Sequence, residues 1–340
     1  MTDRRDPDLF DPPPAPDQPG ETAHRLIGLE PDNLLAFLAL LGLLRALEAA
    51  RPDWRPRAQW DPDHPPLRPV LTLATPATQA DIAQAAAEGC GVLAADHRFE
   101  GHTDVTFDQQ TARALLDEAT NTQTRGRAAL LGAVFSDGAV KDDGKVAAAP
   151  LVAMFGQGHQ HFLTRLSDVP KGVLPKSLAK KKKKPLDLNH PDRLAAALFA
   201  PWTRQDETDG FRWDPEEDRR YALRYRDPSK DAGRTEHGAN RLAAVGLAAL
   251  PGAAVERRGQ IHFLTLGTEL APGRGGRAVT WPIWARPASL ATIQALLGHP
   301  ALAAATPPAE TLRRLGVIGI HRARRIAVGK YFNFTRAEAL

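Results

Sequence analysis

The stretch "LIGLEPDNLLAFLALLGLLRALE", residues 26–48, decides the fold of this chain. Residues 26–29 are apolar and predict a short strand. Asp32 or Asn33 provides a good N-cap, because a short polar side chain can accept hydrogen bonds from the first N–H groups of a helix. The leucines and alanines that follow occupy nearly every side of such a helix, which is typical of a helix inside a core. We therefore expect a buried helix that begins after this cap and ends near Pro52.

The composition is that of an ordinary globular protein. The chain has 340 residues, of which 43% are hydrophobic and 25% charged, and this length predicts two domains or one large composite domain. Its single cysteine, Cys90, excludes an internal disulfide and a thiolate zinc cluster. The most apolar run, residues 34–44, is too short for the roughly 20 residues that cross a bilayer. We therefore expect a cytoplasmic protein without a membrane segment.

Hydrophobic patterns along the rest of the chain alternate between helix and strand. They predict strands over residues 69–74, 261–270 and 277–287, and two strands with an irregular joint over residues 316–334. They predict helices over residues 78–87, 109–119, 192–201, 238–252 and 289–302. Pro282 lacks a backbone N–H and places its strand at an edge or a bulge. The expected fold class is α+β, a composite of short mixed sheets with an apolar N-terminal helix and several short helices.

Two polar segments divide the chain. Residues 1–22 hold six acids and several prolines, so we expect a disordered acidic leader. Residues 170–191 include five consecutive lysines, which repel one another and stay solvated. The expected organisation is a leader over 1–22, an N-terminal α+β domain over 23–169, a basic flexible loop over 170–191 and a C-terminal α+β domain over 192–340.

Residues that could carry catalysis do not form a known pattern. A metal-dependent nuclease would use His97, His102, Asp104, His159 and His161. Histidine pairs hold zinc or manganese, but the spacing assigns no complete ligand set here. The sequence also lacks a phosphate-binding loop, a dinucleotide fingerprint and a nucleophile elbow. We therefore expect a non-enzymatic chain without a metal or cofactor.

Cations interleaved with aromatic residues are the remaining chemical signal. They are dense in the closing stretch "HRARRIAVGKYFNF", and the net charge of the chain is +4. Guanidinium groups fork onto phosphates and planar rings accept bases, so this pattern favours a nucleic-acid partner. The residues predicted to contact nucleic acid are Arg322, Arg324, Arg325 and Lys330 in the closing stretch, Arg274 and Arg277 in "GRGGR", Arg234, Asn240 and Arg241 in "RTEHGANRLAA", and Lys181, Lys182 and Lys183 in the lysine run.

The stretch of residues 26–48 resembles the start of the large-subunit proteins of type I-G (formerly I-U) CRISPR interference complexes (Cascade). The later stretches "FRWDPEEDRRYALRYRDPS", "GANRLAAVGLAALP", "TWPIWARP" and "HRARRIAVGKYFNF" are similar to the second half of that family, in the same order. The resemblance covers most of residues 23–335. The lysine run and the acidic leader are not part of the family pattern.

The resemblance implies a role without catalysis. It implies a large subunit of a CRISPR RNA-guided complex that binds target double-stranded DNA near the protospacer-adjacent motif, helps to open the duplex and recruits the helicase-nuclease in antiviral defence. The implied partners are the backbone and foot subunits, the CRISPR RNA and the helicase-nuclease. In such complexes guide pairing reads the sequence, whereas protein contacts read a short motif and the backbone.

Two alternatives from other classes remain open. The first is a protein scaffold or adaptor whose arginines meet acidic protein surfaces without touching DNA. The second is the metal-dependent nuclease described above, whose cleavage a chelator would abolish.

Overall fold

The structure is a computed structural model of the chain. It describes residues 21–122, 124–153, 161–174, 187–208, 210–217, 234–257, 259–271, 276–302, 304, 307–328 and 331–340. The predicted contacts Lys181, Lys182, Lys183, Arg274 and Lys330 lie outside the described residues, as does most of the predicted leader.

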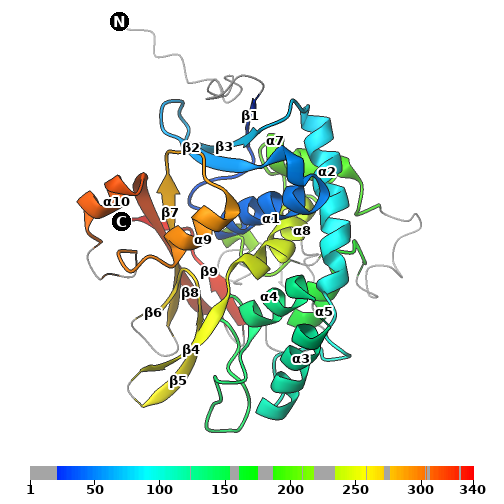
Figure 1. Cartoon of the computed structure of the whole chain (residues 1–340), viewed down its shortest axis with the longest axis vertical. Coiled ribbons are helices and arrows are strands. Elements are labelled where there is room, and N and C mark those ends of the chain that lie inside the picture. Colours follow the sequence, from blue (N-terminus) through cyan, green and yellow to red (C-terminus); the bar gives the residue numbers. More distant parts are fainter. Residues whose placement is uncertain are drawn as a thin grey trace, which may run out of the picture.

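Helix α1 (Leu34–Ala50) lies in the middle of the molecule (Figure 1). Asn33 is its N-cap, and the side-chain oxygen of Asn33 accepts a hydrogen bond from the backbone N of Leu35 at 2.9 Å. Helices α2 (Gln79–Leu93) and α8 (His237–Gly246) pack against α1. The small residues of α1 and α8 allow this close approach, because their backbones can meet without intervening side chains.

Further helices complete the described part of the chain. They are α3 (Gln109–Asn121), α4 (Arg125–Val134), α5 (Phe162–Asp168), α7 (Pro191–Phe199), α9 (Leu290–Leu297) and α10 (Ala309–Arg314), with 3₁₀ turns η1 (Pro52–Trp54), η2 (Ala94–Asp96), η3 (Pro215–Glu217) and η5 (Leu247–Ala249). Within the described ranges, no helix is both long and apolar enough to cross a membrane.

The described strands pair antiparallel in three sheets. One contains β1 (Thr22–Arg25), β3 (Arg68–Leu73) and β2 (Arg57–Asp61), and another is the hairpin of β4 (Gly252–Arg257) and β5 (Gln260–Thr265). The largest contains β10 (Glu338–Ala339), β8 (Val317–Val328), β7 (Arg277–Trp284) and β6 (Thr268–Leu270) in that order, and β9 (Tyr331–Phe334) pairs with β8. The predicted α+β class is confirmed, and the sheets are antiparallel where mixed sheets were expected.

The strand predicted at residues 26–29 is wrong. Strand β1 ends at Arg25, and the backbone N of Leu26 still donates to the carbonyl of Pro69 at 2.8 Å before the chain turns toward α1. Pro282 lies in β7 beyond the residues that pair with β6, so its missing N–H interrupts no ladder on that side. The register between β7 and β8 shifts just after it, at residues 283–284.

One hydrophobic cluster joins the helices to the largest sheet. The ring of Phe37 in α1 stacks on Trp281 of β7 with centroids 5.3 Å apart. Residues of this cluster come from both predicted domains, from Leu26 through to Phe334. The largest sheet is therefore held rigidly against the central helix, and β7 and β8 form a stable base for any side chain that projects from them.

Candidate nucleic-acid interface

Arg322 and Arg324 project from β8 but already face acids. The Nε of Arg322 lies 2.7 Å from a carboxylate oxygen of Glu269, and an Nη of Arg324 lies 2.7 Å from Glu338. The Arg324 pair is about half exposed, and pairs of this kind exchange partners at little cost. A phosphate would have to displace a carboxylate at either residue, so neither offers a vacant positive charge.

Asn240 and Arg241 lie in the core on α8, and both are almost fully buried. The guanidinium of Arg241 donates to three backbone carbonyls, those of Pro170 at 3.1 Å, and of Asn189 and Ala87 at 3.2 Å each. The structure therefore gives these two side chains a structural role in place of the predicted nucleic-acid contact. Arg234, three residues before α8, is exposed.

The structure brings two of the predicted arginines together. Arg277 of β7 and Arg325 of β8 are directly opposite each other in the antiparallel ladder. An Nη of Arg277 donates to Nδ1 of His262 at 3.1 Å, so this imidazole nitrogen accepts, because a guanidinium can only donate. An Nη of Arg325 donates to the carbonyl of Pro150 at 3.2 Å, and the guanidinium lies 4.1 Å from the ring centre of Phe332.

This side-by-side arrangement of cations is electrostatically unfavourable. Burial, and then the positive charge of Arg277, lower the pKa of Arg325 to about 10. Burial also lowers the pKa of Arg277, and burial together with Arg277 lowers the pKa of His262. A lowered pKa means that the surroundings disfavour the charged form, and like charges opposite each other in a sheet repel. An anion between Arg277 and Arg325 would relieve both effects.

A cavity of about 590 Å³ opens at this pair. Its lining is Val140, Lys141, Asp142, Asp143, Ala147, Ala148, Gly259, Gln260, Ile261, His262, Phe263, Arg277 and Arg325. Within the described residues, the Arg277 guanidinium donates to the carbonyl of Gly276 and to His262, and neither of these partners is an acid. Such a cavity is suited to a phosphate group, onto which guanidinium groups fork.

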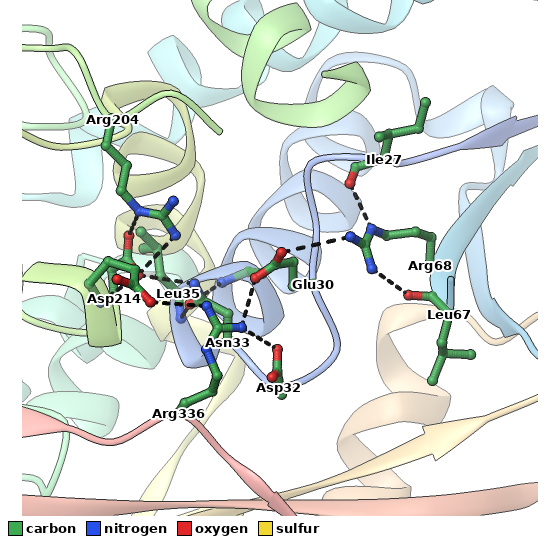
Figure 2. Close-up of polar contacts among 12 residues, drawn as sticks. Ile27, Glu30, Asp32, Asn33, Leu35, Leu67, Arg68, Arg204, Asp214 and Arg336 are labelled. Carbon is green, nitrogen blue, oxygen red and sulfur yellow. Dashed lines mark hydrogen bonds and ion pairs between the residues drawn. The ribbon is translucent and has the colours of Figure 1, made fainter. Parts of the chain in front are cut away.

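A second polar cluster lies at the start of α1, and its carboxylates outnumber its arginines. Arg336 donates to Glu30 and Asp32 at 2.9 Å and to Glu216 at 3.1 Å (Figure 2). Figure 2 also shows Arg204 against Asp214, joined at 2.7 Å. Because each of these guanidinium groups meets carboxylates of the chain itself, the cluster ties segments together and has no positive charge to spare for a phosphate.

Each described histidine considered for a metal site has a contact of its own. His161 lies 2.6 Å from a carboxylate oxygen of Asp104, whereas the buried His97 contacts the backbone carbonyl of Leu166 at 2.6 Å. The ring of His102 packs on Phe107. In the part of the chain that the structure describes, no three His, Cys, Asp or Glu side chains are grouped to hold a metal. His159 lies outside those residues.

Two polar residues of the cavity were missed by the sequence interpretation, the cation Lys141 and the imidazole of His262, which accepts from Arg277. Lys141 comes from residues 136–150, for which the sequence predicts a polar turn or hairpin, and His262 from a predicted strand. These two residues reach the cavity only because their hairpins fold over β7 and β8, and the spacing of residues along the chain does not predict that folding. Comparison with protein families finds no family model that matches this chain, and comparison with curated proteins finds no match either.

Proposed function

We propose that this chain is a non-catalytic, nucleic-acid-binding subunit of a CRISPR RNA-guided DNA-targeting complex, and that it holds a nucleic-acid phosphate between Arg277 and Arg325. The observation that carries the proposal is this pair of facing arginines at the cavity. The assignment to a CRISPR complex rests on the resemblance of residues 26–48 and of the later stretches to the large subunit.

The chemistry of the pair favours a phosphate over an acidic protein side chain. Two guanidinium groups that line one cavity carry several N–H donors between them, and a phosphate has enough oxygens to accept from both. The pair also stands on β7 and β8, which are packed onto α1 through Trp281, so little motion is needed for binding. Rigid placement of this kind reduces the entropy lost on binding.

In the proposed complex the protein is cytoplasmic and works beside other subunits, the CRISPR RNA and a helicase-nuclease. Arg277 and Arg325 would hold the backbone of target DNA near the protospacer-adjacent motif, while guide pairing reads the sequence. Arg322 and Arg324 would contribute less, because their charges are offset by Glu269 and Glu338.

The test is DNA binding by the purified chain over a series of salt concentrations, without divalent metals. Duplex and single-stranded DNA of one sequence would be compared for the wild type and for the double variant Arg277→Gln/Arg325→Gln. Each phosphate contact contributes about 0.9 to the slope of log affinity against log salt for duplex DNA. We therefore expect the double variant to bind more weakly and to have a slope shallower by about one to two.

The matched control is Arg322→Gln/Arg324→Gln, which removes the same charge from the same sheet. We expect its slope to stay close to that of the wild type. Equal losses in both double variants would show that only net charge matters, and a folded wild type that ignores DNA at low salt would move the scaffold alternative ahead. Circular dichroism of each variant establishes that it is folded.

A further inference from the structure

The cavity at the arginine pair is larger than a phosphate requires. Its volume is about 590 Å³, within the range of about 300–1,000 Å³ typical of sites for whole small molecules. A phosphate takes up the space of only a few waters, each with a share of about 30 Å³. Most of the cavity is therefore available to the part of a ligand that is attached to the phosphate.

Two hairpins form the walls of the cavity. One is β4–β5, which reverses at Gly259, and the other is the segment in which Val140 pairs with Val146. Figure 1 shows the β4–β5 hairpin, in yellow, extending away from the body of the molecule. Both arginines contact these walls: Arg277 donates to His262, midway along the β4–β5 hairpin, and Arg325 donates to the carbonyl of Pro150, just after the second hairpin.

The turn of the second hairpin carries carboxylates, unlike the arginine side of the cavity. The second hairpin turns through Asp142 and Asp143, and Asp143 lies 3.5 Å from the ammonium of Lys141. The lining therefore has a cationic end at the arginines and a weakly acidic end at this turn, where Lys141 offsets Asp143 and leaves the charge of Asp142. Carboxylates would repel a second phosphate, but they accept hydrogen bonds from the amino group of a base.

An exposed apolar side chain also lines the cavity. Ile261 of β5 is 43% exposed and lines the cavity, with Ala147 and Ala148 also in the lining. An aliphatic side chain in this position loses exposed apolar surface when a flat ring covers it, and every base offers such a ring.

We propose that the cavity binds one unpaired nucleotide, with its phosphate at Arg277 and Arg325, its base over Ile261, and the base edge toward Asp142 and Asp143. This inference rests on the proposed function and deepens it, because it selects single-stranded over duplex nucleic acid at this site. The acidic end selects a base with an exocyclic amino group. Cytosine, whose N4 amino group donates, therefore binds more tightly than uracil, which has a carbonyl oxygen at the same position.

The test uses cytidine 5′-monophosphate, uridine 5′-monophosphate and ribose 5-phosphate as competitors of a labelled single strand on the full chain. The thermal unfolding midpoint with each compound alone gives an independent readout. We expect cytidine monophosphate to compete at about tenfold lower concentration than uridine monophosphate, and ribose 5-phosphate to be the weakest. Ile261→Ser should weaken both nucleotides and leave ribose 5-phosphate unchanged, whereas Asp142→Asn/Asp143→Asn should remove the preference for cytosine.

The outcomes separate this inference from the proposed function. Equal competition by all three compounds would overturn the nucleotide site while leaving phosphate binding by the arginines intact. Strand binding without any competition would also overturn the nucleotide site alone. Nucleotides that raise the unfolding midpoint of a chain that binds no strand would support the site and overturn the nucleic-acid function.

Discussion

Gly42 of α1 lies directly against the backbone of Leu242 in α8. A Cβ atom placed on Gly42 would be 1.8 Å from the carbonyl oxygen of Leu242, and one on Gly246 of α8 would be 2.4 Å from the carbonyl oxygen of Leu38. The two helices therefore approach each other at glycines on both sides. Any side chain at these positions must push the helices apart.

Gly42→Ala should lower the free energy of unfolding by about 3 kcal/mol, because overpacking against a backbone cannot be relieved by a change of rotamer. Urea denaturation measures this loss. Gly132→Ala is the matched control, since Gly132 lies in α4 and a Cβ there has nothing within 4 Å. Alanine favours a helix over glycine by about 1 kcal/mol, so we expect this control to be neutral or stabilising. A Gly42 variant as stable as the control would show that α1 and α8 are not in contact as described.

Substitutions at Asn33 should lower the free energy of unfolding by different amounts, according to how many of its contacts they remove. Its oxygen caps α1, and its amide nitrogen donates to Asp214 at 3.0 Å. Asn33→Ala removes both interactions and should cost about 2–4 kcal/mol, whereas Asn33→Ser keeps a cap and should cost about half as much. Chemical denaturation at neutral pH distinguishes the two variants.

Asn33→Asp gives the sharpest outcome for this position. The variant keeps the capping oxygen but places a second buried carboxylate against Asp214, and two close carboxylates cannot both ionise without cost. We expect a larger loss of stability at pH 7 than at pH 5, where one of the two can hold a proton. An aspartate variant with wild-type stability at pH 7 would contradict the described contact.

A feature could be predicted from the sequence where it depends on neighbouring residues, and could not where it depends on residues far apart in the chain. The N-cap of α1 depends on its immediate neighbours, so the sequence narrows it to Asp32 or Asn33, and the structure selects Asn33. The burial of Arg241 depends on carbonyls at Pro170, Asn189 and Ala87, which only the fold brings together. A count of charges therefore treats Arg241 and Arg325 alike, although one is a core residue and the other lines the cavity.

The pairing of Arg277 with Arg325 was beyond sequence reasoning for a related reason. It depends on the register of β7 against β8, and a shift of one residue would turn the side chain to the other face of the sheet. Both arginines were predicted as nucleic-acid contacts. Nothing in their local patterns set them apart from Arg322 and Arg324, whose acidic partners are Glu269 and Glu338.

Buried histidines should make stability depend on pH. Burial lowers the pKa of His97 to about 3 and that of His237 to about 4, from an ordinary value of 6.5. Between these values and 6.5 the unfolded chain binds protons that the folded chain does not, so stability rises with pH. We expect the free energy of unfolding to have its full value above pH 6.5. Below pH 6.5 it should fall by about 1.4 kcal/mol per pH unit for each of these two histidines.

Unfolding free energies from urea titrations between pH 4.5 and 7.5 test this dependence. His97→Gln lowers stability at every pH but should make the dependence shallower, because one buried titrating group is gone. A His97 variant with the full wild-type slope would show that His97 titrates normally in the folded chain.

The Cys90 thiol should not react with reagents in solution while the protein is folded. It is the single cysteine, it is fully buried in α2, and burial raises its pKa to about 11 although Arg241 and Arg45 act in the opposite direction. An aromatic disulfide reagent at pH 8 should therefore label no thiol in the folded chain and one thiol per chain in denaturant, since the thiolate is the reactive form.

The labelling rate then measures how often the packing around α1 is broken. Cys90 follows Gly89, where a Cβ would lie 1.9 Å from the carbonyl oxygen of Ala46, so α2 must separate from α1 before reagent can enter. Because labelling requires an opened state, its rate scales with the population of that state. Gly42→Ala should raise the rate about a hundredfold if it costs about 3 kcal/mol, whereas Gly132→Ala should not raise it. Rapid labelling of the wild type, or equal rates in the two glycine variants, would mean that Cys90 is reached by local motion of α2 alone and that α1, α2 and α8 do not open as one unit.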